Sequence, residues 1–209
     1  MTSEWLRPVD DASFRCWWPG DDVQYQDYHD TEWGRPVRDD QRLFEKMCLE
    51  GFQSGLSWLT ILRKRENFRA AFDNFDFHKV ALYSDVDVNR LLADAGIVRH
   101  RGKIEAVINN ALRAQELIHE LGSLTDFIWS YAPDTPFGRD GESGHPSGLA
   151  TTSPSAVRLS KDLKKRGWKF VGPTTMYSFM QSMGLVNDHV DGCWVQHECE
   201  QLRRKHTNS

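Results

Sequence analysis

Two cysteines and two histidines near opposite ends of the chain have side chains that could bind zinc. Cys16 and His29 lie in CWWPGDDVQYQDYHD, and His189 and Cys193 lie in LVNDHVDGC. Thiolate and imidazole are the ligands that zinc prefers, and two of each complete a tetrahedral structural site. If His189 and Cys193 lie on a helix, their spacing of four places them on one face. The four residues predict a structural zinc ion that joins the two ends of the chain.

The same residues leave alternatives open. Unrelated Cys and His residues are common, so the spacing alone does not require a metal. His197 and Cys199 are rival ligands close by. A catalytic zinc usually has three protein ligands and an open position for water, and a site with four protein ligands lacks that position.

A group of aromatic residues in the first 58 positions offers a second kind of chemistry. Its members are Trp17, Trp18, Tyr25, Tyr28, Trp33 and Trp58. In QYQDYHDTEWG they alternate with charged and turn-forming residues, unlike the periodic stripe of a helical core. Electron-rich rings around a cavity suit a flat, cationic ligand through stacking and cation–π attraction. The alternative is an ordinary aromatic core, because such rings bury a large area.

Two further features could contact a ligand. Glu50 precedes Gly51 at the end of the apolar stretch LFEKMCLEG, so its carboxylate points either into a cavity or into solvent at the end of a helix. In FVGPTT, Pro173 opens a predicted helix, and the amides of Thr174 and Thr175 could hold a phosphate there. A plain pair of packed helices would give the same pattern.

Helical spacing dominates the segments that must position these residues. One predicted helix face contains Leu43, Phe44, Met47 and Cys48, and another contains Ile104, Val107, Ile108, Ala111 and Leu112. The sequence therefore predicts an all-α protein. We expect a tail at 1–13, a single domain at 14–196 and a second tail at 197–209. Within the domain we expect a flexible Pro-, Gly- and Ser-rich loop at 132–150 and a hairpin at about 163–183.

Composition narrows the possible functions. The 209 residues carry a net charge of −4, which argues against nucleic-acid binding by bulk positive charge but allows a few local phosphate contacts. No apolar run approaches the roughly 20 residues that cross a bilayer, and the N-terminus lacks an apolar signal core. Four cysteines are too few for a disulfide framework. We therefore expect a cytoplasmic protein with no membrane contact.

Six stretches in order along residues 14–196 resemble one family, the bacterial 3-methyladenine DNA glycosylase I proteins of the helix-hairpin-helix superfamily. They are YHDTEWG, LFEKMCLEGFQSGLSW, LRKREN, DAGIVRHRGKI, KKRGWKFVG and YSFMQSMGLVNDHVDGC. The resemblance implies an all-α helix-hairpin-helix DNA glycosylase fold with a zinc-stapled N- and C-terminal region. It implies a monomeric base-excision-repair enzyme of the nucleoid that removes 3-methyladenine from alkylated double-stranded DNA without lyase activity. Whether 3-methylguanine is also removed stays open.

The resemblance also implies roles for individual residues. One structural zinc ion would be bound by Cys16, His29, His189 and Cys193. The carboxylate that contacts the excised base would be Glu50. The base pocket would be formed by Tyr25, Tyr28 and Trp58, with Trp18 and Trp33 nearby. DNA would be contacted by Gly55 and Leu56, which intrude where the base has left, and by Gly172, Thr174 and Thr175 of the hairpin. Because Asn187 replaces the aspartate of the wider superfamily's VDxH pattern, no catalytic role transfers to Asp188.

The implied reaction needs recognition more than strong acid catalysis. Methylation at N3 makes adenine positively charged and weakens its bond to the sugar, so the base is already a good leaving group. We expect Glu50 to accept hydrogen bonds from the exocyclic amine while water attacks the sugar carbon. Two rival functions remain: a module that binds alkylated bases without excising them, and a zinc hydrolase that acts on a small molecule.

Overall fold

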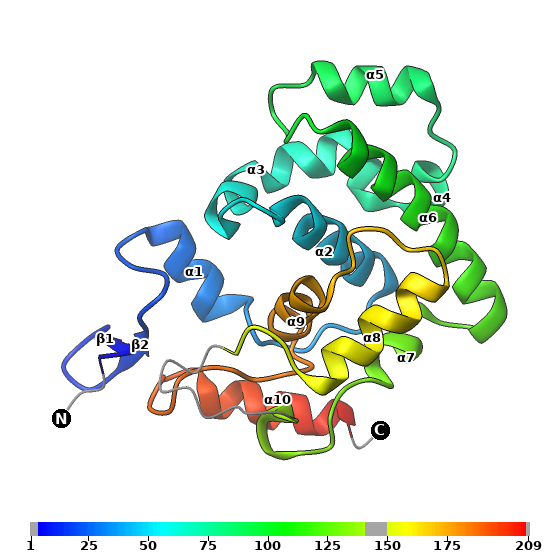
Figure 1. Cartoon of the computed structure of the whole chain (residues 1–209). Helices are drawn as coiled ribbons and strands as arrows, with labels where there is room; N and C mark the ends of the chain where they lie inside the picture. Colours follow the sequence, from blue (N-terminus) through cyan, green and yellow to red (C-terminus); the bar gives the residue numbers. More distant parts are fainter. Residues whose placement is uncertain (1–3, 141–149, 208–209) are drawn as a thin grey trace.

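The computed structural model describes residues 4–140 and 150–207, which form mainly α-helices (Figure 1). The helices are α1 (Val23–Thr31), α2 (Asp40–Gln53), α3 (Trp58–Ala71), α4 (Phe77–Val80), α5 (Asp85–Ala93), α6 (Arg101–Leu121), α7 (Leu124–Trp129), α8 (Pro154–Lys165), α9 (Pro173–Ser182) and α10 (Gln196–Thr207). Short 3-10 turns lie at Asp73–Phe75 and Pro136–Gly138. The antiparallel strands β1 (Leu6–Pro8) and β2 (Phe14–Cys16) add one small ribbon to the predicted helical fold.

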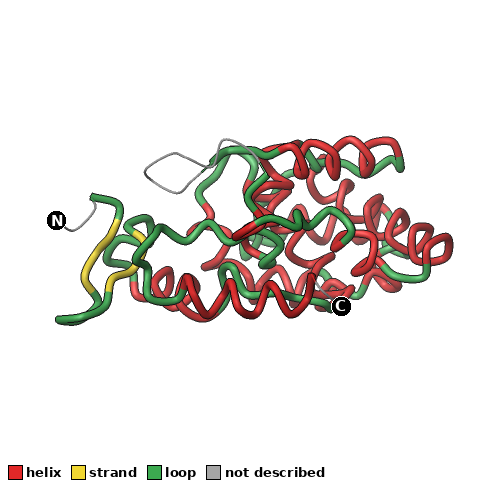
Figure 2. Tube along the Cα trace, turned by 90° about the horizontal axis from the view of Figure 1, so that it is seen from below, coloured by secondary structure: helices red, strands yellow, loops and turns green. Residues whose placement is uncertain are grey.

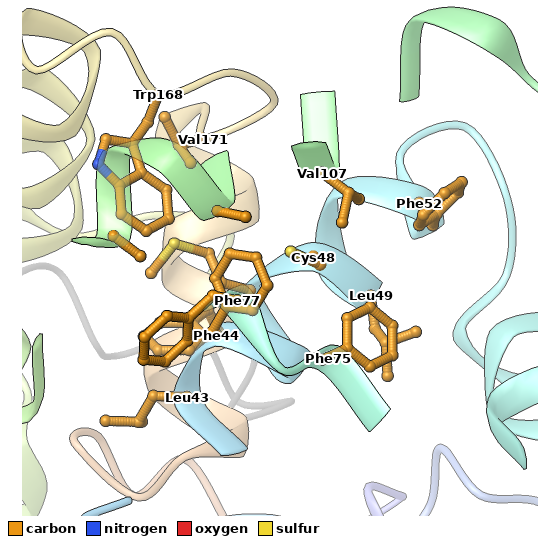
Figure 3. Close-up of a cluster of buried hydrophobic side chains, with 14 of the residues drawn as sticks. Leu43, Phe44, Cys48, Leu49, Phe52, Phe75, Phe77, Val107, Trp168 and Val171 are labelled. Atoms are coloured by element: carbon orange, nitrogen blue, oxygen red, sulfur yellow. The ribbon is translucent and has the colours of Figure 1, made fainter. Parts of the chain in front are cut away.

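Helix α2 forms the centre of the hydrophobic core. Every residue of α2 from Leu43 to Phe52 is buried, and the helix packs against α3, α6, α7 and α9. Figure 3 shows Phe44, Cys48 and Leu49 of α2 among side chains from other elements, including Trp168 and Val107. Because α2 is enclosed on all sides, a side chain near its C-terminal end is held by a rigid support. None of the helices in the described ranges combines the length and apolar character needed to cross a membrane.

Helix α6 fixes the loop between α2 and α3. The Lys103 ammonium donates to the carbonyl oxygens of Phe52, at 2.9 Å, and Ser54, at 2.6 Å. Carbonyls at a helix C-terminus have no partner within the helix, so a buried ammonium is a suitable donor. Ser57 then caps α3 by accepting from the amide of Thr60 at 3.2 Å.

The same helix also holds the turn between α8 and α9. The side chain of Asn110 donates to the carbonyl of Lys169 and accepts from its amide, both at 2.9 Å. The Asn109 amide donates to the carbonyl of Gly167, also at 2.9 Å. Since Lys103 and Asn110 are seven residues apart, one face of α6 supports both connecting loops. The hairpin predicted at about 163–183 covers the end of α8, this turn and α9.

The predicted tails are partly structured. Residues 6–8 pair with residues 14–16, and Phe14 forms a bridge with Cys193, so the N-terminal segment contacts the segment before α10. Figure 2 shows this ribbon at one end of the molecule. Helix α10 covers most of the predicted C-terminal tail and buries Cys199 and the ion pair between Glu200 and Arg203. The sequence did not indicate this helix, because the charged side chains that α10 buries resemble a solvated segment in sequence.

Part of the predicted loop at 132–150 packs against the body of the protein. Arg203 donates to the carbonyls of Pro133, at 3.2 Å, and Thr135, at 2.8 Å. Arg139 donates to the carbonyls of Asn187, at 3.2 Å, and His189, at 3.0 Å. Positions 141–149 of the predicted loop lie outside the described residues.

We predict that Gly184→Ala destabilises the fold strongly. Gly184 has φ +75°, and an added Cβ would lie 2.4 Å from the backbone nitrogen of Pro36. We expect urea denaturation to show a loss of about 3 kcal/mol or more in the free energy of unfolding. The matched control is Gly20→Ala, because Gly20 also has a positive φ, +57°, but has open space around it. Its expected loss is about 1–2 kcal/mol, and equal losses in the two variants would contradict the packing argument.

Candidate functional site

An aromatic pocket of about 190 Å³ lies among α1, α2, α3 and α9. Its lining consists of Trp18, Tyr25, Tyr28, Trp33, Glu50, Gln53, Trp58, Ser178 and Gln181. The structure therefore brings together Glu50 and the five aromatic residues that the sequence analysis assigned to a base pocket. The volume is below the roughly 300–1,000 Å³ of sites for drug-sized ligands, so it suits a small, flat molecule.

Helices α1 and α3 supply three of the rings. Asp22 caps α1 by accepting from the amide of Tyr25 at 3.0 Å. Tyr25 and Tyr28 are three residues apart and therefore share a helix face. Trp58 is the first residue of α3, and its ring centroid lies 5.5 Å from that of Tyr28.

The other two rings connect the pocket with the histidines near the chain ends. The centroid of Trp18 lies 4.9 Å from that of Tyr25 and 5.1 Å from that of Trp33. The centroid of His29 is 5.1 Å from that of Trp18 and 6.0 Å from that of Trp33. Trp33 also packs on His189, with centroids 4.6 Å apart. This wall of the pocket is therefore built against the two histidines.

A buried lysine, which the sequence analysis missed, holds Glu50. The Lys46 Nζ lies 2.9 Å from the Glu50 Oε1 and donates to the Tyr28 hydroxyl at 2.9 Å. It also lies 3.1 Å from the ring centroid of Trp58. Burial lowers the pKa of Lys46 to about 8, although Glu50 opposes this shift. The signal in the sequence was the spacing of four between a lysine and a glutamate on one predicted helix.

The two tyrosines keep their protons at neutral pH. Burial, followed by the charge of Glu50, raises the pKa of Tyr25 to about 12. The same two causes raise the pKa of Tyr28 well above its ordinary value. Each phenol can therefore donate a hydrogen bond at the pocket.

Asp188 is fully engaged in structural contacts. It accepts from the Tyr177 hydroxyl at 2.6 Å and from the Gln181 side-chain amide at 2.7 Å, and Arg139 lies 3.3 Å away. Burial raises the pKa of Asp188, and these hydrogen bonds oppose the rise. Asp188 orients Gln181 at the pocket. These contacts agree with the sequence analysis, which assigned no catalytic role to Asp188.

Three polar residues of the pocket carried no signal in the sequence. They are Gln53, Ser178 and Gln181. An isolated Gln or Ser is compatible with almost any surface position, so only the packing of α2 against α9 identifies them.

Three of the four predicted zinc ligands form a compact buried group. The ligand atoms of Cys16, His29 and Cys193 all lie within 4.8 Å of one another. His189 lies beside them, with its ring centroid 5.0 Å from that of His29. Within the described ranges the His189 Nε2 is buried without a hydrogen-bond partner, which costs free energy unless another group satisfies it. Two thiols and two imidazoles fit a tetrahedral zinc site, and zinc would satisfy this nitrogen.

Neighbouring residues orient the two imidazole rings. His29 Nδ1 lies 2.8 Å from the Asp30 carboxylate, which Arg15 also contacts at 2.8 Å. His189 Nδ1 lies 2.8 Å from the side-chain oxygen of Asn187. Such contacts at one ring nitrogen leave the other available as a metal ligand. Gly34 is required beside His189, because a Cβ there would lie 2.6 Å from the ring.

The two rival ligands lie outside this group. His197 is exposed, and its ring nitrogen lies 2.8 Å from the Gln201 amide. Cys199 is buried in an apolar cluster, where burial raises the pKa of its thiol to about 11. Neither residue therefore belongs to the compact group of Cys16, His29 and Cys193.

The residues predicted to contact DNA lie on the two loops that α6 supports and in the first turn of α9. Leu56 has 41% of its surface exposed, and Gly55 has φ +81°. Gly172 precedes α9, and no side chain among the residues that the structure describes caps the amides of Thr174 and Thr175 there. These amides and the helix dipole form a site that could hold a phosphate.

The two loops approach one another at the C-terminal end of α2. A Cβ added to Gly51 would lie 3.3 Å from the Cβ of Phe170, so the α8–α9 turn packs directly on this helix end. The turn therefore lies beside the same end of α2 that supplies Glu50 to the aromatic pocket.

Comparisons with known proteins agree with this site. The chain matches the family model for methyladenine glycosylase over residues 18–197. It is 51% identical over 179 residues to DNA-3-methyladenine glycosylase 1 of Escherichia coli (strain K12), covering 86% of this chain and 95% of that protein. It is 47% identical over 180 residues to DNA-3-methyladenine glycosylase of Haemophilus influenzae (strain ATCC 51907 / DSM 11121 / KW20 / Rd), with coverage of 86% and 96%.

A solved structure shows the same fold. The structure of a 3-methyladenine DNA glycosylase I from Staphylococcus aureus, described as the structural basis of 3-methyladenine recognition, superposes with a TM-score of 0.80. The two sequences are 40% identical, and the match covers 87% of this chain and 96% of that chain. The family match contains the whole lining of the aromatic pocket and three of the four candidate zinc ligands. The chain belongs to the methyladenine glycosylase family.

Proposed function

We propose that this protein is a base-excision-repair glycosylase that hydrolytically removes 3-methyladenine from alkylated double-stranded DNA. The observation that carries the proposal is a small pocket in which a buried carboxylate, Glu50, faces aromatic rings. The family relationship supports the same function. Leu56 and the α8–α9 turn lie on loops near the pocket, and the amides at the start of α9 could hold a phosphate. These features support duplex DNA as the substrate.

The pocket suits a positively charged base that has left the duplex. Extruding a base costs a few kcal/mol, and less when the base is damaged. Stacking on aromatic rings returns about 1–3 kcal/mol per base. A desolvated cation–π contact adds about 2 kcal/mol for a cationic base, and neutral adenine lacks this contribution. Binding therefore selects the alkylated base through both its charge and its lower cost of extrusion.

Glu50 would receive the exocyclic amine of the base. Lys46 contacts Oε1, whereas Oε2 accepts no hydrogen bond within the described part of the chain and remains available at the pocket. The carboxylate stabilises the cation in place while water attacks the sugar carbon. The glycosidic bond breaks as the bond to water forms, its electron pair neutralises the departing 3-methyladenine, and the attacking water loses a proton to solvent.

The contacts of Lys46 support hydrolysis without strand cleavage. Lyase chemistry needs an amine that can attack the sugar carbon. Lys46 is paired with Glu50 and lines the adjacent cavity instead of the aromatic pocket. We therefore propose a monofunctional enzyme. We also propose that it acts as a monomer in the cytoplasm, where the nucleoid lies. A gel shift without released base would favour the alternative binding module.

We also propose one structural zinc ion per chain, bound by Cys16, His29, His189 and Cys193. The compact thiol and imidazole group and the unpartnered His189 nitrogen support this assignment. Bound there, zinc would supply no reaction chemistry, because four protein ligands leave no position for water. The four side chains would instead hold β2, α1 and the segment before α10 together.

The first test of the function is release of free base. We expect chromatography of alkylated DNA treated with the wild-type protein to show free 3-methyladenine. Glu50→Gln removes the negative charge but keeps the shape, and we expect it to slow single-turnover release by roughly 10- to 100-fold. Glu116→Gln on the exposed side of α6 is the control and should keep the wild-type rate. Full activity of Glu50→Gln would exclude the proposed role of Glu50.

The zinc assignment is tested by elemental analysis of freshly purified protein. We expect about one zinc per chain in the wild type and none in Cys193→Ser, whose melting temperature should fall by about 5 °C or more. Cys199→Ser is the matched control, since Cys199 is a buried cysteine outside the proposed ligand set, and it should retain the metal. Absence of zinc from the wild type, or its retention in Cys193→Ser, would overturn the assignment.

A further inference from the structure

Lys46 places a buried positive charge behind the aromatic wall of the base pocket. Its Nζ lies 3.1 Å from the ring centroid of Trp58 and 5.1 Å from that of Tyr28. Both rings line the 190 Å³ pocket and also a neighbouring cavity of about 420 Å³. Of these two cavities, as the described residues form them, Lys46 lines the neighbouring one and not the pocket, whereas Glu50 lines the pocket and not its neighbour. Trp58 therefore presents one face to the ammonium and another part of its surface to the pocket.

The Lys46 ammonium weakens the attraction of the pocket for a second cation. The ammonium lies against Trp58, so a second cation on this ring would be repelled through a poorly screened interior. The same ammonium offsets the charge of Glu50 and contacts its Oε1. A cationic base at Oε2 would therefore meet a weaker negative potential than Glu50 and the rings alone would create.

We propose that Lys46 is a specificity-determining residue, whose charge reduces the pocket's preference for cationic over neutral nucleobases while its hydrogen bonds position Glu50 and Tyr28. This inference rests on the proposed function, since it concerns the selectivity of the same pocket. The pocket consequently admits neutral purines more readily than one with an uncharged residue at position 46.

The other carboxylates around Lys46 are committed to arginines. Glu32 accepts from Arg65 at 2.6 and 2.8 Å, and Glu45 accepts from Arg69 at 2.8 Å. Glu50 is therefore the principal counter-ion of Lys46. Eight charged or titratable residues face Lys46 or line its cavity. They are Tyr28, Glu32, Arg35, Arg42, Glu45, Glu50, Arg65 and Arg69.

Titration of Lys46 gives the inference a pH signature. Burial lowers the pKa of Lys46 to about 8, so the lysine loses its charge progressively between about pH 7 and pH 9. The repulsion of a cationic base decreases over the same window. Preference for the cationic base should therefore rise with pH in the wild type, and variants that cannot titrate at position 46 should lack this rise.

The experiment compares Lys46→Met with Lys46→Arg. Methionine removes the charge but keeps a long side chain, and arginine keeps the charge throughout this pH range. Single-turnover release of 3-methyladenine from alkylated DNA reports on the cationic base. The affinity for free adenine, measured by tryptophan fluorescence, reports on a neutral one. Lys79→Met, on α4, is the surface control, because Lys79 lies outside both cavities.

We expect Lys46→Met to raise the ratio of 3-methyladenine release to adenine affinity by at least about tenfold at pH 7, because a like charge within about 10 Å repels by that order at an effective dielectric constant of about 20. Lys46→Arg should not raise this ratio, and Lys79→Met should match the wild type. Between pH 7 and pH 9 the ratio should increase in the wild type and stay flat in both Lys46 variants.

Several results separate the possible failures. If the wild type releases no 3-methyladenine, the proposed function is wrong. If the wild type is active but its ratio and pH profile match those of folded Lys46→Met, the inference about Lys46 alone is wrong. If folded Lys46→Met loses 3-methyladenine release and adenine affinity by the same factor, Lys46 only positions its neighbours, and the specificity claim is overturned. If Lys46→Met does not fold, the comparison of wild-type and Lys46→Arg pH profiles decides the same question.

Discussion

The base pocket depends on the packing of one short helix, α1. Only Tyr28 and His29 of its nine residues are buried. Tyr28 faces the pocket, and His29 belongs to the thiol and imidazole group. A helix with so little buried surface cannot hold its own position through hydrophobic packing alone. The contacts of His29 with Cys193 and Trp33 therefore fix the tyrosine wall, which links the ends of the chain to the pocket.

The opposite side of the pocket is fixed by burial. Helix α2 presents both Lys46 and Glu50 from the interior of the protein, where an unpaired charge would be strongly destabilising. Pairing makes these charges tolerable and also restricts the carboxylate to one orientation. Helix α6 extends this rigidity to the surface through Lys103 and Asn110, so the pocket and the two adjacent loops share one frame.

The central helices and the residues of the pocket were predictable from local patterns in the sequence. Apolar spacing identified α2 and α6, and the ordered family motifs identified Glu50 and the five rings of the pocket. The failures have physical causes. Helix α10 buries Glu200 and Arg203 as a pair, which hydrophobic spacing cannot reveal. The close approaches of Gly34 to His189 and of Gly184 to Pro36 join segments distant in sequence, and no local pattern encodes them.

The proposed reaction assigns no general acid to the described lining of the pocket, where Glu50 acts as a carboxylate, and it does not require one. Asp188 is occupied by Tyr177 and Gln181, and the tyrosines retain their protons. A neutral base would need protonation in order to leave, whereas N3-methylated adenine carries its positive charge already. Selection can therefore be made at binding, through the balance of Glu50, the rings and Lys46. Changing the charge at position 46 alters which base is held long enough for water to react, whereas Glu50 acts both in holding the base and while water attacks.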